Sequence, residues 1–184
     1  MKLGLTFKRE EWKMNKKEVQ RRVLKGGGPL ALSLFTWNEK TKTFSSEASD
    51  LLIDLSGVDG CTFKTRDGCT FITGDGCTFK TGSNCTFDTG FSCTFDTLSK
   101  CIFKTGFSCI FGTLSDCTFD TGHRCTFDTG PRCTFRTGHD CVVVRRDVFE
   151  VIKLEPSRKI RLNDYDIRGF VVLNERVKEA SVSR

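Results

Sequence analysis

The sequence has no long apolar run: nothing approaches the ~20 consecutive apolar residues that a membrane-spanning helix needs. Residues 1–8 lack the apolar stretch of a secretory signal peptide. Histidine is scarce, with only His123 and His139, which leaves few candidates for a catalytic or zinc site. We therefore expect a cytoplasmic or virion location, no membrane contact, no metal or other cofactor, and no enzymatic activity.

Net positive charge is missing from most of the chain, because the basic and acidic residues after residue 25 balance. Residues 1–25 contain nine Lys and Arg against three Glu, which accounts for the whole net charge of +6. A basic segment can bind phosphate groups, and Lys16, Lys17, Arg21 and Arg22 are the candidates for a weak nucleic-acid contact. A solvated helix surface explains the same residues more simply, so we do not expect nucleic acid to be the main partner.

A repeat of eight residues dominates the middle of the chain. All eleven cysteines follow this spacing: Cys61, Cys69, Cys77, Cys85, Cys93, Cys101, Cys109, Cys117, Cys125, Cys133 and Cys141. The first ten begin Cys-Thr-Phe or Cys-Ile-Phe, with Thr at position 5 and usually Gly at position 6. Apolar residues or Thr at positions 1, 3 and 5 give the period-2 pattern of a strand with one buried face. Positions 6–8 supply a turn.

Two octapeptides form one coil, because similar residues recur at steps of sixteen. One column at position 6 is pure glycine: Gly74, Gly90, Gly106, Gly122 and Gly138. Position 4 on one face reads Ile72, Asp88, Lys104, Asp120 and Arg136 at this step, so the charges alternate in sign from Asp88 onward. The predicted fold is therefore all-β: a two-faced parallel β-solenoid, or β-roll, with 16 residues per coil. Inside it, Phe faces Phe and Cys faces Thr.

The cysteines admit several interpretations. Disulfides across the core are disfavoured because facing sheets lie ~10 Å apart, which exceeds the reach of a disulfide. The eight-residue spacing does not match zinc motifs, and a catalytic thiol would need a nearby base. We favour a small, buried and reduced residue that fits beside Phe.

We expect caps at both ends, a small α/β cap before the solenoid and a β cap after it. The predicted parts are a basic segment and cap over residues 1–52, the solenoid over 53–151, and a cap and tail over 152–184. A short helix is expected at about 15–25, since Asn15 and Glu18 form a capping box.

The ends of the repeat frame follow from the eight-residue count. Ile53 and Leu55 are expected to replace Cys and Phe, and residues 149–151 to continue the frame. Apolar residues beyond Pro156 predict short strands over the last coil: Ile160, Leu162, Tyr165, Ile167, Phe170, Val171 and Val172. Residues 174–184 are expected to fray, and either Met1 or Met14 could be the start.

The run from Asp116 to Gly122 resembles the Cys-Thr-Phe octapeptide-repeat proteins encoded by bacteriophages, other viruses or mobile elements. The resemblance covers about residues 53–151. It implies a solenoid and a viral context, but it brings no binding residues with it.

Apolar departures from the repeat consensus are the best candidates for a binding surface, because stacking does not require them. They cluster between residues 91 and 114: Phe91, Phe107, Leu98, Leu114, Ile102 and Ile110. An exposed apolar belt of this kind marks a partner or self-association site. We expect a structural or assembly protein whose partners are itself, as an oligomer or filament, or other viral structural proteins. The alternative is a recognition or adhesion module that binds a ligand or surface through its flat faces.

Overall fold

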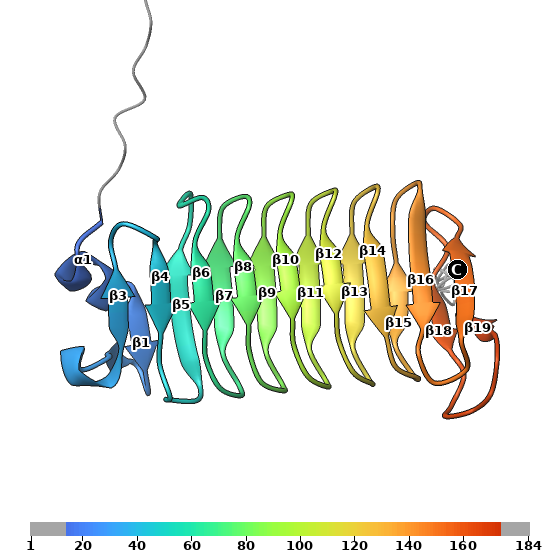
Figure 1. Cartoon of the computed structure of the whole chain (residues 1–184), viewed down its shortest axis with the longest axis horizontal. Coiled ribbons are helices and arrows are strands. Elements are labelled where there is room, and N and C mark those ends of the chain that lie inside the picture. The colour runs from blue at the N-terminus through green and yellow to red at the C-terminus, as the bar shows by residue number, and fades with distance from the viewer. Residues whose placement is uncertain (1–13, 174–184) are drawn as a thin grey trace, which may run out of the picture.

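A computed structural model describes residues 14–173, which form a rod of two stacked β-sheets (Figure 1). One sheet has ten strands in the order β19-β18-β15-β13-β11-β9-β7-β5-β1-β2. The other has nine, in the order β17-β16-β14-β12-β10-β8-β6-β4-β3. No helix among the described residues is long and apolar enough to span a membrane.

The parallel part of the rod confirms the predicted solenoid with 16 residues per coil. In the ten-stranded sheet it comprises β5 (Leu51–Leu55), β7 (Thr70–Thr73), β9 (Thr86–Thr89), β11 (Ile102–Thr105), β13 (Thr118–Thr121) and β15 (Thr134–Arg136). In the nine-stranded sheet it comprises β4 (Thr43–Ser45), β6 (Thr62–Lys64), β8 (Thr78–Lys80), β10 (Thr94–Asp96), β12 (Ile110–Gly112), β14 (Thr126–Thr129) and β16 (Cys141–Arg145). Stacked partners such as Phe87 and Phe103 are 16 residues apart, and the roll makes about six turns.

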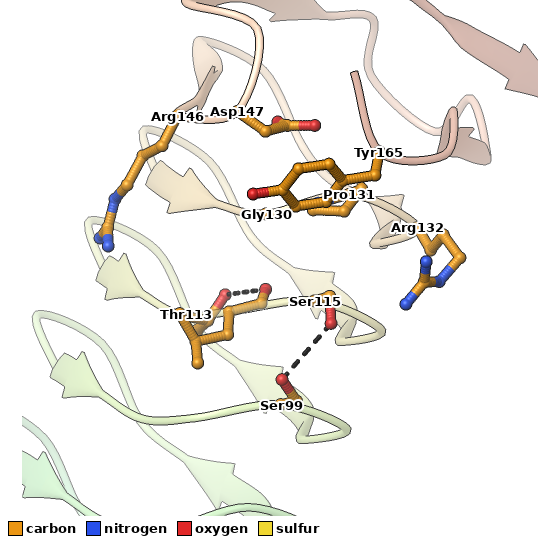
Figure 2. A pocket seen from close by; sticks show the side chains of 10 residues that line it. Ser99, Thr113, Ser115, Gly130, Pro131, Arg132, Arg146, Asp147 and Tyr165 are labelled. Atoms are coloured by element: carbon orange, nitrogen blue, oxygen red, sulfur yellow. Dashed lines mark hydrogen bonds between the residues drawn. The ribbon is translucent and has the colours of Figure 1, made fainter. Parts of the chain in front are cut away.

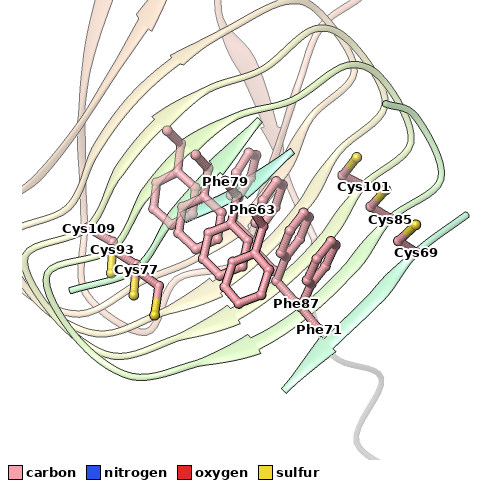
Figure 3. Packing of buried hydrophobic residues seen from close by; sticks show 14 of the residues in the cluster. Phe63, Cys69, Phe71, Cys77, Phe79, Cys85, Phe87, Cys93, Cys101 and Cys109 are labelled. Carbon is pink, nitrogen blue, oxygen red and sulfur yellow. The ribbon is translucent and has the colours of Figure 1, made fainter. Parts of the chain in front are cut away.

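Phenylalanine fills the centre of the rod, as the repeat predicts. Within one sheet the rings stack nearly parallel, as for Phe87 and Phe103 at 4.9 Å and 3°. Across the core they meet edge to face, as for Phe95 and Phe103 at 5.2 Å and 76°. Such pairs add about 0.5–1.5 kcal/mol each beyond area burial. Figure 3 shows the ring stacks flanked on both sides by columns of cysteine.

The alternating charges on the ten-stranded sheet form the expected ion pairs. Lys104 Nζ lies 3.3 Å from Asp88, and Arg136 Nη2 lies 2.5 Å from Asp120. These pairs are exposed, so each adds about 0.2–1 kcal/mol at most. Their main effect is on register, because a slip by one coil would place like charges side by side.

The N-terminal cap contains α1 (Lys16–Gln20), β1 (Val23–Lys25), β2 (Gly28–Pro29), a 3-10 turn (Leu32–Leu34) and β3 (Thr36–Asn38). The capping box is confirmed: Asn15 accepts from the Glu18 amide at 3.1 Å, and Glu18 accepts from the Asn15 amide at 2.7 Å. The predicted helix over 15–25 is wrong in length. Val23–Lys25 pairs antiparallel with β5, because that strand offers an open edge and Val23 is fully buried there.

The predicted alignment of Ile53 and Leu55 with the octapeptide repeat is also wrong, by two residues. Ile53 pairs with Phe71, so it occupies the Phe position and not the Cys position. Extra residues in the corner around Gly57 break the eight-residue count. One strand earlier, Phe44 stacks on Phe63, so parallel stacking begins at β4.

The C-terminal cap contains β17 (Glu150–Leu154), β18 (Ile160–Leu162) and β19 (Phe170–Val172). Residues 149–151 do not continue the frame: Phe149 has φ 48° in a turn, and β17 returns antiparallel to β16. β18 and β19 fold over the last coil as expected. Tyr165 and Ile167 lie instead in the exposed loop between them. The expectation for residues 174–184 lies outside the described residues.

Candidate interaction surfaces

The corner between the two sheets has a backbone conformation that the repeat consensus conceals. Position 8, just before each cysteine, is left-handed in every coil. It is Gly60, Gly68 and Gly76 in the first coils. After these it is non-glycine, with φ between 56° and 62°: Asn84, Ser92, Lys100, Ser108, Asp116, Arg124, Arg132 and Asp140. Left-handed backbone disfavours residues with a Cβ, so these corners hold some strain.

The glycine column at position 6 has a packing cause. A Cβ at Gly106 would lie 3.1 Å from the Gly90 carbonyl carbon, and one at Gly122 would lie 3.0 Å from that of Gly106. A side chain at this edge would therefore force the backbone of the neighbouring coil to shift by a few tenths of an ångström. This leaves position 7 as the outward-pointing residue of the corner.

Several side chains at position 7 accept a hydrogen bond from a backbone amide of the next coil. Asp67 Oδ1 accepts from the Ser83 amide at 2.7 Å, and Asp75 Oδ1 accepts from the Phe91 amide at 3.1 Å. Farther along, His123 Nδ1 accepts from the His139 amide at 2.9 Å. The side chain thus acts as a backbone cap between coils.

Phe91 and Phe107 interrupt that pattern. A phenyl ring has no acceptor for the next amide. The two rings instead stack on each other at 4.8 Å and 6°, and they remain 40% and 46% exposed. The structure therefore places both rings on the surface, at the corner that leads from the ten-stranded to the nine-stranded sheet. Next to them, Phe107 shares a shallow cavity of about 420 Å³ with His123 and His139.

The opposite corner carries Leu98 and Leu114, which are stacked neighbours and both 46% exposed. Leu114 lines a cavity of about 540 Å³ together with Pro131 and Tyr165 (Figure 2). Arg132 and Arg146 also line it, and both are held by carboxylates: Arg132 by Asp116 and Asp164, Arg146 by Asp128. The cavity therefore offers an apolar wall between charges that are already paired.

Ile102 and Ile110 lie on opposite faces, in β11 and β12, and are 52% and 55% exposed. The six predicted residues are thus all at the surface, in neighbouring coils, as two corner pairs and one residue on each face. They surround the rod and do not merge into one patch. A single flat partner can touch only part of this belt.

Three of the four candidate basic residues near the N-terminus make contacts that the structure describes: Lys16, Arg21 and Arg22. Lys16 Nζ lies 5.0 Å above the centre of the Phe35 ring, in a cation–π contact. Arg21 and Arg22 line a separate hollow that also contains Asp54, whose pKa is lowered mainly by the Ser56 hydroxyl.

The cysteine thiols serve the fold. All eleven are free and buried. In a typical case the single S–H of Cys93 is shared between two acceptors, the Phe91 carbonyl at 3.5 Å and the Gly74 carbonyl at 3.8 Å from Sγ. A hydrogen bond to Cys117, with burial, raises the pKa of Cys101 to about 11, which keeps that thiol protonated at neutral pH. No group of three or more potential metal ligands occurs among residues 14–173.

One apolar surface was missed by sequence reasoning. Large apolar side chains are also exposed at the C-terminal end: Phe149, Val151, Tyr165, Ile167, Phe170, Val171 and Val172. The signal was the run Phe170–Val172, since three consecutive apolar residues cannot all face a core in one strand.

Comparisons with protein-family models, with curated proteins and with solved structures gave no match.

Proposed function

We propose that the protein is a non-enzymatic structural rod that assembles with protein partners, including further copies of itself, through apolar side chains on its corners and faces. The observation that carries this proposal is the change at position 7. In the position-7 column that starts with Asp75, the side chain that bonds to the next coil is replaced by two stacked, exposed phenyl rings, Phe91 and Phe107. Stacking gains little from such a change, whereas a partner surface gains a rigid aromatic anchor.

The viral or phage setting is part of this proposal and rests on the octapeptide motif alone. In that setting the rod would scaffold or decorate a particle, or self-associate within one. Its regular core and paired surface charges favour a stiff spacer.

Light scattering and negative-stain imaging across a concentration series, in reducing buffer, test the proposal. The informative variant is Phe91→Asn with Phe107→Asn, because Asn restores an acceptor at position 7 and removes both rings without adding charge. Ile72→Thr is the control, since it trims an exposed apolar residue outside the belt. Loss of partner binding or of a belt-mediated oligomer in the double variant, but not in the control, supports the proposal. Unchanged behaviour in both refutes the role of the rings.

A recognition module is the second candidate, and the faces favour it. Each sheet presents an outward column of Thr at position 2, with Ile102 or Ile110 near its middle. Such a flat, weakly charged strip suits contact with an extended surface. A chain that remains monomeric at high concentration, and then binds a ligand through residues of one face, would favour this function over assembly.

A further inference from the structure

The outermost strands at the two ends of the rod differ in how well they are protected from pairing with a further strand. At the N-terminal end, the outermost strand of the ten-stranded sheet is β2, a two-residue strand that contains Pro29. Proline and very short strands block edge-to-edge pairing. At the C-terminal end, the outermost strands are β17 and β19, which have no proline and carry exposed apolar residues. Among the described residues, the edges of β17 and β19 therefore lack the protection that Pro29 gives to β2; at the N-terminal end the nine-stranded sheet finishes in β3, a strand of three residues without proline.

The inner face of β19 is incompletely covered. Its residues Val172 and Phe170 pair with Ile160 and Leu162 of β18, so they point to the same side of the sheet. Ile160 and Leu162 are 4% and 1% exposed, whereas Phe170 and Val172 are both 38% exposed.

The stagger of the two sheets explains why Phe170 and Val172 are more exposed than Ile160 and Leu162. Inside the rod each Phe meets two rings of the other sheet: Phe119, for example, contacts Phe111 and Phe127. β19 has only β17 across from it, because β17 ends the nine-stranded sheet among the described residues. One further strand beside β17 would cover Phe170 and Val172.

Residues 2–8 have the alternation of apolar residues that a strand beside β17 would need to cover Phe170 and Val172. They read Lys-Leu-Gly-Leu-Thr-Phe-Lys, so that Leu3, Leu5 and Phe7 share one side of an extended strand and Gly4 and Thr6 lie on the other. Residues 174–184, which follow β19 directly, contain only two Val and one Ala and no such alternation.

A chain cannot place residues 2–8 on its own C-terminal end. Met14 is fixed at the opposite end, where its carbonyl accepts from Trp37 Nε1 of β3 at 2.6 Å. β3 and β17 bound a sheet of nine strands, which at ~4.8 Å spacing separates them by about 38 Å. Residues 8–14 span about 20 Å when fully extended. The donor must be another copy.

We propose that residues 2–8 of one copy add as a strand to the free edge of β17 in the next copy and cover Phe170 and Val172, which joins the rods head to tail. This inference rests on the proposed assembly function and names one of its contacts. Such a contact uses two different surfaces, so it repeats without closing and produces a linear filament.

A mixing experiment with the full chain tests this directly. Leu5→Asp removes a donor and leaves the acceptor intact, whereas Phe170→Asp does the reverse. Each alone is expected to weaken association at least about 100-fold, because it buries a carboxylate in an apolar contact. An equal mixture should give a species of twice 20.7 kDa by light scattering, and nothing larger. Thr6→Asp, with the same charge on the opposite side of the strand, should assemble like the unmodified chain.

Three results would overturn the proposal. If Leu5→Asp and Phe170→Asp assemble normally, the strand contact is wrong while assembly through other surfaces stands. If assembly appears only after residues 174–184 are removed, the chain covers its own end. If the unmodified chain is monomeric at all concentrations, both this contact and self-assembly fail. Thr6→Asp places the same charge in the same segment, so its comparison with Leu5→Asp separates loss of the contact from a general effect of the charge.

Discussion

The buried ion pair of Arg145 and Asp147 is expected to hold the C-terminal cap in place, and Asp147→Asn tests this. The Arg145 side chain is 0% exposed and that of Asp147 is 4% exposed. Arg145 Nε donates to Asp147 at 3.1 Å, and Nη1 and Nη2 donate to the carbonyls of Ile167 and Asp164 at 2.7 and 3.2 Å. One guanidinium thus links the end of β16 to the loop between β18 and β19.

The expected cost follows from burial. Asp147→Asn keeps the size of the side chain but leaves a buried guanidinium without its counter-charge, which typically costs about 3–5 kcal/mol. Replacing both partners, as in Arg145→Met with Asp147→Leu, removes the uncompensated charge. It still leaves two loop carbonyls without a donor, at about 1–3 kcal/mol each. By these ranges the double variant should lose about as much stability as Asp147→Asn, so removing the unpaired charge alone should bring no clear recovery.

Urea denaturation gives the free energy of unfolding, and hydrogen exchange of residues 160–173 shows where it is lost. In a solenoid each coil contacts only its neighbours, so exchange should rise in the cap and stay unchanged in the central coils. Asp128→Asn is the matched control: Asp128 pairs with Arg146 in the same region, but the two side chains are 47% and 54% exposed. We expect that control to lose less than about 1 kcal/mol.

Equal losses for Asp147→Asn and Asp128→Asn would refute the reasoning, because burial would then not set the cost. Faster hydrogen exchange throughout the rod would refute the prediction that the loss of stability is confined to the C-terminal cap.

Three further predictions concern the coils. Thr97→Val should raise the free energy of unfolding by about 1 kcal/mol, because the buried Thr97 hydroxyl has no hydrogen-bond partner. Thr113→Val, in the same column, is the control and should bring no gain, since the Thr113 hydroxyl donates to the Leu114 carbonyl at 3.4 Å. Lys100→Gly should stabilise by about 0.5–1 kcal/mol in thermal unfolding, since Lys100 has φ 60°. Arg132 lowers the pKa of Asp116 to about 2, so this carboxylate contributes stability above pH ~4 that is lost as the pH falls towards 2. In Arg132→Gln the free energy of unfolding should therefore change less with pH between about 4 and 2.

The coil itself could be predicted from sequence because each of its contacts is repeated. The sixteen-residue step of the glycine column predicts the pairing of strands such as β9 and β11, and the alternation at position 4 predicts the ion pair of Lys104 and Asp88. Exposure of departures such as Ile102 and Ile110 also followed, because position 2 points away from the core in the period-2 alternation of the strand.

The caps could not be predicted to the same degree because their contacts occur once. Val23 looks like part of a helix until β5 offers its open edge. Ile53 fits the eight-residue count, yet a longer corner moves it to the Phe position. The left-handed position 8 was concealed for a different reason: glycine occupies it only in the first coils, and later coils place residues such as Lys100 and Arg124 there.

The cap and the proposed strand contact are physically connected. Arg145 fixes the loop at Asp164 and Ile167, and that loop joins β18 to β19, which carries the proposed acceptor residue Phe170. Loosening the loop would leave β19 less ordered and raise the entropic cost of adding a strand. Asp147→Asn should therefore weaken head-to-tail assembly although Asp147 lies outside the proposed contact, whereas Asp128→Asn should leave assembly unchanged. Light scattering of both variants at equal concentration decides this. Normal assembly of Asp147→Asn, with its cap shown to be loosened by hydrogen exchange, would mean that the added strand does not pack on Phe170 and Val172 of β19.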